Sequence, residues 1–495
     1  MSRKGILMIL DGYGEGKAGP YNAVKNSNTP TLDELKKMSH SLLKTDSEAV
    51  GLFHNELGGS EVGHTTIGAG RVVLSTAKKI HDDILSGEFK KNSKLIKKID
   101  NLTKSGGNLH LIGLMSDKNI HSDIYHAFEI MKLFNKKAKN IFIHFITDGR
   151  DSGGEDSLIY LNQMQKQMKK ITNVEIASVM GRFYAMDREN NLDRTSLAVD
   201  TMFNLDNKKS NINATNIEKY LKDEHKNGVT DEYIHPVHID TKADSHLKKN
   251  DLIFFFNFRE DRLRQIVKKT YEINHNIITM SSVGGVKTTV LYQPKIVKNT
   301  LSEYLSKQGL KQIKISETTK YAHVTYFLNG GVETPFARED RVHIPTIKVD
   351  NFNKTPKMKA EDITNEIIKA MDKNYDAIIV NFSNPDMLGH TGDYEATVKA
   401  LEFLDKCIKK VIAHAKKSDY FILLTADHGN SECMRTESGE PHTAHTFNRV
   451  FCMAVEKDKN YKFKKYGELK DVAPTFLDLM QLKPNKSFTG KSLII

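Results

Sequence analysis

The sequence predicts an α/β protein built on mostly parallel sheets, and two observations support this fold class. Short runs rich in Val, Ile, Leu and Phe recur along nearly the whole chain, and polar stretches with helical periodicity lie between them. The expected strands cover residues 5–10, 109–114, 140–147, 174–179, 252–256, 377–382 and 421–425. The expected helices include residues 157–170, 360–373 and 394–416. Such alternation is typical of parallel strands covered by helices.

The length of the chain predicts more than one domain. At 495 residues it is too long for a single ordinary core, so two or three compact units are expected. The composition changes after Arg71, where a region rich in Lys, Asp and Asn begins, and a second glycine-containing stretch starts at Gly284. We expect these two places to be hinges around an inserted domain, and the alternative is that they are ordinary surface loops.

Charge and cysteine content narrow the functional class. The chain has 73 basic and 62 acidic residues, a net charge of +11 that fits nucleic acid, a membrane surface or a small polyanionic substrate. Its lysines are spread evenly and it has no Trp, so no aromatic and basic groove for nucleic acid is apparent. The three cysteines lack CxxC spacing, which gives no indication of a disulfide framework or a thiolate zinc site. The apolar run from Ile6 to Leu10 is too short for a signal peptide or a membrane span, so a cytoplasmic protein is expected.

Asp11 directly follows the first expected strand. Ligand sites in open α/β sheets lie beyond the carboxyl ends of strands, so this carboxylate is well placed for binding. The stretch from Gly14 to Gly19 also matches GxGxxG, but no convincing helix follows it, which disfavours a dinucleotide site.

Ser60 lies in the glycine-rich segment Leu57-Gly-Gly-Ser-Glu-Val-Gly-His64. A helix beginning at this serine would direct its first N–H groups towards anionic oxygens, and the glycines allow the backbone to approach a ligand closely. The segment therefore suggests a nucleophile for a phosphoryl group. The alternative is a serine that only caps a helix.

Carboxylates and imidazoles recur after two further expected strands. Asp386 and His390 are four residues apart, so a helix beginning near Pro385 would place them on one face. Asp427 and His428 follow the last expected strand, and two histidines, His442 and His445, lie in the next loop. Any one of them could be a structural residue, but the set together suggests a metal centre.

Ligands of these types, without thiolates, suit Mn²⁺, Zn²⁺ or Co²⁺. Two ions about 4 Å apart would neutralise a phosphoryl group and activate the serine hydroxyl. The chemistry predicted from these residues is phosphoryl transfer through a phosphoserine.

The middle of the chain carries several motifs in which arginines stand beside acidic residues. Arginine binds carboxylate and phosphate oxygens bidentately, while a neighbouring histidine or aspartate can exchange a proton with a substrate hydroxyl. The alternative for each motif is a surface ion pair. The candidate residues are His121, Arg150, Asp151, Arg182, Arg188, Arg259 and Arg262.

Taken in order, these motifs resemble those of the cofactor-independent phosphoglycerate mutases, over essentially the full chain. The resemblance continues through Ser316-Glu-Thr-Thr-Lys320 and the terminal Thr489-Gly-Lys-Ser492. It implies an alkaline-phosphatase-like three-layer domain made of residues 1–75 and 294–495, with an α/β phosphotransferase domain, residues 76–293, inserted between them.

The resemblance also implies the role of each site residue. Asp386, His390 and His445 would bind one manganese ion, and Asp11, Ser60, Asp427 and His428 the other, with Mg²⁺, Co²⁺ or Zn²⁺ as possible replacements. The substrate-binding residues would be His121, Arg150, Asp151, Arg182, Arg188, Arg259, Arg262 and Lys320.

The implied reaction interconverts 3-phosphoglycerate and 2-phosphoglycerate without 2,3-bisphosphoglycerate. Ser60 would carry the phosphoryl group, Lys320 would counter its charge and Asp151 would act as acid and base. Closure of the two domains would exclude water from the phosphoenzyme. A monomer is expected, because an active site formed by one chain needs no partner.

The chain departs from the family pattern at Gly59, at Lys118-Asn119 and at Ser152-Gly-Gly154, where Asn, Gly-Gly and Thr-Pro-Pro are usual. None of these changes removes a candidate ligand. The nearest alternative is a metal-dependent phosphatase or a phosphopentomutase-like enzyme, against which the arginine motifs argue. An alternative of another class is a basic nucleic-acid-binding protein, which would bind in a salt-sensitive way even after Ser60→Ala or chelation.

Overall fold

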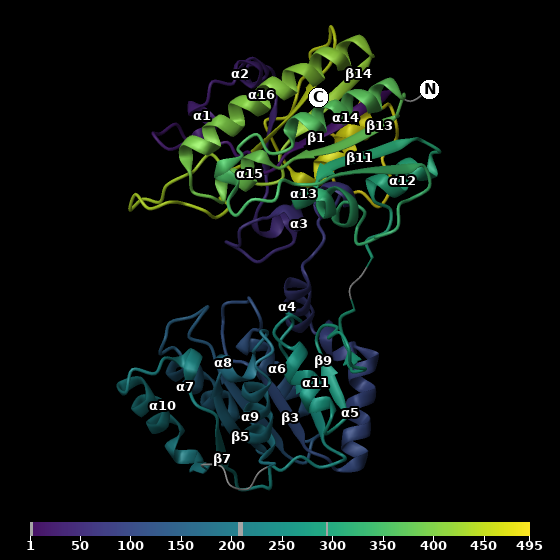
Figure 1. Cartoon of the computed structure of the whole chain (residues 1–495). Coiled ribbons are helices and arrows are strands. Elements are labelled where there is room, and N and C mark those ends of the chain that lie inside the picture. The colour runs from purple at the N-terminus through teal and green to yellow at the C-terminus, as the bar shows by residue number, and fades with distance from the viewer. Residues whose placement is uncertain (1–2, 206–210, 294–295) are drawn as a thin grey trace. The chain divides into compact units, whose positions relative to one another are not determined.

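The chain folds into two compact units, each with its own sheet (Figure 1). The computed structural model describes residues 3–205, 211–293 and 296–495. Unit 1 combines Met1–Ser75 with Lys295–Ile495, and unit 2 is Thr76–Pro294. Both contain parallel strands connected through helices, so the predicted α/β class is confirmed.

Within the described residues, the sheet of unit 1 has eight strands in the order β12-β11-β13-β1-β14-β15-β2-β16. In that order the strands are Glu339–Ile344, Gln312–Glu317, Ala377–Phe382, Lys4–Leu10, Tyr420–Thr425, Val450–Val455, Ser41–Lys44 and Tyr466–Glu468. The five strands from β12 to β14 are parallel, and β15 runs antiparallel to both of its neighbours. The mostly parallel arrangement thus holds around β1, while β11, β12, β15, β2 and β16 were not among the expected strands.

Strands β13 and β14 are buried along their whole length, although successive side chains of a strand point to opposite faces. Both faces of this sheet are therefore covered, and helices provide the cover. Helices α14 and α16 pack on each other and on β13 and β14, whereas α3 contacts α12 and α17. The helices of unit 1 are α1 (Ala23–Asn26), α2 (Pro30–Lys36), α3 (Ser60–Ala69), α12 (Leu301–Lys307), α13 (Thr318–Ala322), α14 (Ala360–Asp372), α15 (Asn384–Gly389), α16 (Tyr394–Lys417) and α17 (Val472–Leu479).

The described part of unit 2 has a second eight-stranded sheet, in the order β10-β9-β8-β3-β4-β5-β7-β6. In that order the strands are Thr289–Val290, Ile277–Thr279, Leu252–Phe255, Leu109–Leu114, Ile141–Thr147, Val174–Gly181, Val237–Asp240 and Asn211–Asn213. Its helices are α4 (Thr76–Ser86), α5 (Ser93–Ser105), α6 (Ile124–Phe134), α7 (Ser157–Met168), α8 (Arg182–Ala185), α9 (Leu192–Phe203), α10 (Ile217–Lys226) and α11 (Arg264–Tyr271). All its strand pairs are parallel except β5 with β7.

Two hydrophobic cores lie on the two faces of this second sheet. Leu111 and Ile143 belong to one core, while Ile112, the next residue after Leu111, and Ile146, three residues after Ile143, belong to the other. Alternation of this kind requires apolar helices on both sides, so unit 2 has three layers.

Two sequence features are explained by the local structure. After β1 the chain forms turns and irregular segments until the four-residue helix α1, so the stretch from Gly14 to Gly19 does not open a helix and is not a dinucleotide fingerprint. The glycine stretch at Gly284 lies within unit 2, just before β10. In the described part of the chain, no helix combines the length and the apolar character needed to cross a bilayer.

Candidate metal centre and anion-binding cluster

Three acidic residues of unit 1 lie at the carboxyl ends of three neighbouring parallel strands. Asp11 follows β1, Asp427 lies two residues beyond β14, and Asp386 is in α15, which begins just after β13. These strands are adjacent in the order β13-β1-β14. Strand order therefore explains why residues so far apart in sequence form one site.

Ser60 is the first residue of α3, as the glycine-rich segment predicted. Its Oγ is 2.9 Å from His428 Nε2 and donates a hydrogen bond of 3.2 Å to Asp11 Oδ1. Lys320 Nζ donates to the same Oγ at 2.6 Å. The hydroxyl therefore lies between a cation, a carboxylate and an imidazole, the groups that activate a serine nucleophile.

One set of candidate metal ligands surrounds this serine. Asp11, Asp427 and His428 are fully buried, and one donor atom from each lies within 4.8 Å of the others. His428 Nε2 is 3.4 Å from Asp11 Oδ1 and 3.5 Å from Asp427 Oδ2. Ser60 is close enough to complete the set.

A second set surrounds Asp386. Its Oδ1 lies 3.2 Å from His390 Nε2 and 3.4 Å from His445 Nε2, and these two nitrogens are 3.2 Å apart. Ligands of one ion at about 2.1 Å are separated from each other by about 3.0–3.4 Å, so the triangle has the right size for a divalent cation.

The tautomers of both histidines suit metal binding. His390 Nδ1 faces the carbonyl oxygen of Thr443 at 2.7 Å, and His445 Nδ1 faces that of Gly58 at 2.8 Å. A carbonyl oxygen holds the proton on Nδ1, which leaves the Nε2 lone pair directed at Asp386. One group of candidate ligands found among the described residues combines Asp386 and His445 with His428 rather than with His390. His442, the other histidine of this loop, belongs to none of the three groups found there.

Lys320 joins the two sets electrostatically. Its Nζ is 2.8 Å from Asp11 Oδ1 and 2.6 Å from Asp386 Oδ2. Burial alone would lower the pKa of Lys320, but Asp11, Asp386 and Asp427 together raise it above its usual value. Burial likewise opposes ionisation of Asp386, yet Lys320 holds the pKa of that carboxyl well below its usual range. The centre is thus charged and closely packed.

Several buried side chains that the sequence did not single out hold the ligands in place. Asn381 donates to Asp11 Oδ2 at 2.7 Å, and Asn430 donates to Asp386 Oδ1 at 2.8 Å. His64 Nδ1 is 3.2 Å from Asp427 Oδ2. All three belong to the same motifs as the ligands, and this proximity in sequence was the one available signal.

Gly12 is required by the close approach of α15. Its φ is +74°, and a Cβ there would lie 2.7 Å from the Asp386 backbone. By contrast, Gly59 has an extended backbone with φ of −164°, and a Cβ there would meet only the His445 ring at 3.4 Å. The departure at Gly59 therefore leaves the metal centre sterically intact. Asn119 has φ of +58°, a conformation that Asn tolerates better than most residues, where the family has glycine.

In unit 2, Arg182 is the centre of a second cluster, beyond the carboxyl ends of β3, β4 and β5. Its side chain is only 3% exposed and contacts Asp148 at 2.6 Å, Asp151 at 2.5 Å and His121 Nε2 at 3.0 Å. Burial first, and then the charge of Arg182, lower the pKa of His121 to about 4. Asp148, which sequence reasoning missed, is almost fully buried here.

The remaining candidate arginines of unit 2 surround this group. Arg188 and Arg259 both contact Asp261, at 3.3 and 3.1 Å. Arg150 contacts Glu232 at 3.2 Å. Burial lowers the pKa of Arg262, and the positive charges of Arg188, Arg182 and Arg150 lower it further, so these side chains lie within electrostatic range of one another. Such a concentration of guanidinium groups suits an anion with several oxygens.

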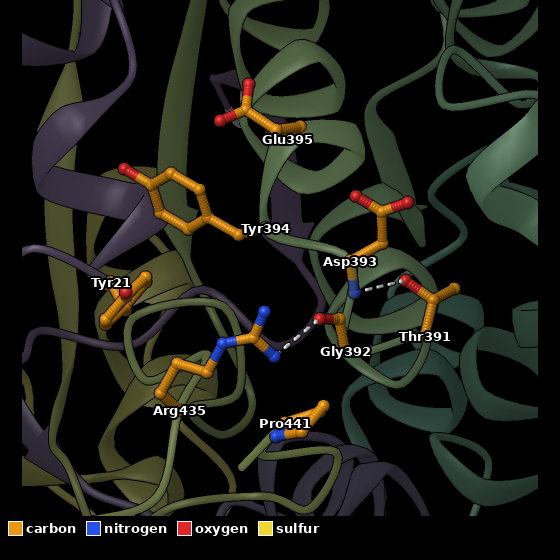
Figure 2. Close-up of a pocket in the computed structure, with 8 residues that line it drawn as sticks. All are labelled: Tyr21, Thr391, Gly392, Asp393, Tyr394, Glu395, Arg435 and Pro441. Atoms are coloured by element: carbon orange, nitrogen blue, oxygen red, sulfur yellow. Dashed lines mark hydrogen bonds between the residues drawn. The ribbon is translucent and has the colours of Figure 1, made fainter. Parts of the chain in front are cut away.

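A pocket of about 440 Å³ borders the second ligand set (Figure 2). Thr391, the residue after His390, lies on its wall, as does Pro441 from the loop that carries His445. Arg435 projects between Tyr21 and Gly392 and donates to the Gly392 carbonyl oxygen at 3.4 Å. None of the predicted site residues lines this pocket.

The fold and the two ligand sets define a metalloenzyme, and the chain matches the Metalloenzyme superfamily over residues 3–484. More particularly, it belongs to the family of 2,3-bisphosphoglycerate-independent phosphoglycerate mutases. The mutase of Clostridium kluyveri is 40% identical over 508 residues, covering 99% of each chain. That of Clostridium tetani is 41% identical over 514 residues, covering 100% of this chain and 99% of the relative.

A solved structure agrees with this assignment. The phosphoglycerate mutase of Leishmania mexicana, determined at low cobalt concentration, matches with a TM-score of 0.65 and 27% sequence identity. The match covers 100% of this chain and 98% of that chain.

Proposed function

We propose that this protein interconverts 3-phosphoglycerate and 2-phosphoglycerate without 2,3-bisphosphoglycerate, through a phosphoserine on Ser60. The observation that carries the proposal is the position of Ser60 Oγ, within 3.2 Å of Lys320, Asp11 and His428. Full-length relatives named as 2,3-bisphosphoglycerate-independent phosphoglycerate mutases support the substrate assignment.

We propose that two manganese ions occupy the two ligand sets. Asp386, His390 and His445 would hold one ion, and Asp11, Asp427, His428 and Ser60 the other. These oxygen and nitrogen donors also fit Mg²⁺, Co²⁺ or Zn²⁺. When bound, such ions supply Lewis acidity towards phosphoryl oxygens.

The chain's own residues would perform the remaining steps. Lys320 would donate a hydrogen bond to the transferring phosphoryl group and offset the charge that develops on it. Ser60 would take the phosphoryl group from one hydroxyl of the glycerate and return it to the other.

In unit 2, we propose that the arginine cluster holds the glycerate and that Asp151 moves the hydroxyl proton. Arg182 lies against Asp151, and His121 completes the group. The substrate would replace the carboxylates that contact Arg150, Arg188 and Arg259, and it would also contact Arg262. We also propose that a monomer in the cytoplasm performs the reaction.

Phosphorus NMR tests this proposal. Manganese-loaded protein is mixed with 3-phosphoglycerate in the strict absence of 2,3-bisphosphoglycerate, alongside a chelated control. We expect 2-phosphoglycerate to appear only in the metal-loaded sample. Release of free phosphate instead would identify a phosphatase and would contradict the role of the arginine cluster.

A further inference from the structure

A third group of metal-ligand side chains lies in unit 2, and it shares no residue with the metal centre or the arginine cluster described above. It consists of His81 in α4, Asp123 at the N-cap of α6, and His126 in the first turn of that helix. Helix α4 is the first helix of unit 2, and it contacts α6 (Figure 1). One donor atom from each of the three side chains lies within 4.8 Å of the others.

The two carboxylate oxygens of Asp123 make different contacts. Oδ1 accepts the backbone N–H of Tyr125 at 2.8 Å, which caps α6. Oδ2 faces the histidines, 3.2 Å from His81 Nδ1 and 3.9 Å from His126 Nε2. The cap therefore fixes the carboxylate and leaves one oxygen free to bind a ligand.

His126 is the unusual member of the group. Its side chain is fully buried, and neither ring nitrogen has a hydrogen-bond partner. A buried polar group without a partner costs free energy and calls for an explanation, such as a bound ion. Burial, reinforced by the nearby His81, lowers the pKa of His126 to about 3, so its imidazole is neutral and has a lone pair to donate.

Aromatic side chains surround the group. The ring of Phe258 lies 6.1 Å from that of His126, and the ring of Tyr125 lies 6.0 Å from that of His81. The two histidine rings are themselves 5.6 Å apart. A partly apolar environment of this kind lowers the local dielectric and strengthens the attraction between a cation and its ligands.

We propose that His81, Asp123 and His126 bind a Zn²⁺ ion. Two imidazoles and one carboxylate form a three-ligand set common for zinc, with a fourth position for water. Only small movements are needed, because the donor separations exceed those of a metal-bound set by no more than about 1–2 Å.

We expect this ion to hold two helices of unit 2 together. It would join α4, which follows the boundary between the units, to the start of α6. It would also fix Asp123, two residues after the substrate candidate His121, whose carbonyl oxygen accepts the Phe258 N–H at 2.8 Å. The inference is independent of the proposed mutase function, because none of the three residues belongs to the catalytic sets.

Metal analysis of the full-length protein tests this site. Asp123→Asn is the main variant, because Asn removes the charge but caps a helix as well as Asp. His81→Gln is the second variant, and His275→Gln, an exposed histidine of the same unit, is the matched control. All proteins are stripped with EDTA and dialysed against zinc, and the zinc content per chain is measured by mass spectrometry.

We expect Asp123→Asn and His81→Gln to hold one zinc ion fewer per chain than the parent, and His275→Gln to equal the parent. The catalytic sets are unchanged in all four proteins, so zinc bound there cancels in the comparison. Circular dichroism in EDTA verifies that each variant is folded. Equal zinc contents in the parent and both variants would overturn the proposal.

Zinc-edge anomalous diffraction from zinc-loaded crystals of the parent gives a test that needs no variant. A peak between His81, Asp123 and His126 is expected, and peaks confined to unit 1 would contradict the site.

Discussion

The metal centre of unit 1 and the arginine cluster of unit 2 differ mainly in burial. In unit 1, Asp11, Asp427 and His428 are fully buried and fixed by hydrogen bonds. In unit 2, the central Arg182 is also buried, but the side chains of Arg150 and Arg259 around it are 53% and 52% exposed and rest on carboxylates. A buried site keeps its geometry between turnovers, whereas exposed ion pairs exchange partners at little cost. The contrast is consistent with the proposal that unit 1 performs the chemistry and unit 2 captures the substrate.

The largest effect is expected from Ser60→Ala, which removes the proposed nucleophile. Mutase turnover should fall by a factor of about 10⁴ or more, because no other group can carry the phosphoryl intermediate. Steady-state assays of 2-phosphoglycerate formation measure this loss. The matched control is Ser302→Ala, a buried serine of the same unit, which should retain activity. A Ser60→Ala protein with parental turnover would remove the basis for the phosphoserine mechanism.

The second largest effect is expected from Lys320→Met, which removes the positive charge between the two ligand sets. We expect the turnover number to fall by a factor of about 10²–10³. In EDTA the variant should also lose about 3–5 kcal/mol of unfolding free energy, because buried carboxylates lose their partner. Manganese should restore much of this stability.

Kinetic assays and urea denaturation with and without Mn²⁺ check both parts of the Lys320 prediction. Lys354→Met, which replaces an exposed lysine of unit 1, serves as the control. Unchanged turnover in Lys320→Met would show that this ammonium has no role in the reaction.

Within unit 2, burial predicts an order of sensitivity among the arginines. Arg182→Lys should lower kcat/KM by a factor of about 10², because lysine cannot reproduce the fork that binds Asp148 and Asp151. Arg150→Lys, at a half-exposed position, should cost about tenfold or less, mostly through KM. Measurement of both variants with 3-phosphoglycerate gives the order. The reverse order would mean that burial is not what distinguishes these arginines.

The smallest effect is a pH dependence of stability that arises from His121. The pKa of His121 is near 6.5 in the unfolded chain and about 4 in the folded chain. Between these values the unfolded state binds more protons, so stability is fully present above pH 6.5 and falls as the pH drops towards 4. From pH 7 to pH 5, this group should remove about 2 kcal/mol of unfolding free energy.

Urea denaturation of the parent and of His121→Gln at pH 7 and pH 5 isolates this contribution, because the other histidines act equally in both proteins. The variant should lose about 2 kcal/mol less than the parent over this interval. Identical losses would contradict the neutral state assigned to His121.

The sequence predicted the local features of both regions better than their assembly. The helix beginning at Ser60 and the contact between Asp386 and His390 followed from capping and helical spacing. The neighbouring positions of β13, β1 and β14 did not, because Ile9 aligns with Asn381, and no local signal encodes such pairing.

The side chains that hold the candidate ligands in place could not be identified from the sequence, for a similar reason. The partner of Asn381 is Asp11, and that of His64 is Asp427, so their roles are defined by tertiary contacts alone. The same holds for Asp148, whose contact with Arg182 joins the ends of the neighbouring strands β4 and β5. Periodicity identifies which residues are buried, but it does not identify the polar partner that a buried group finds.

The most direct test of the central claim is to trap the intermediate on Ser60. Manganese-loaded protein is mixed with 3-phosphoglycerate, quenched in acid within the first turnovers, and digested for mass spectrometry. The account predicts one added phosphoryl group on the peptide that contains Ser60, and none on that peptide in Ser60→Ala. Formation of 2-phosphoglycerate while Ser60 stays unmodified would contradict it.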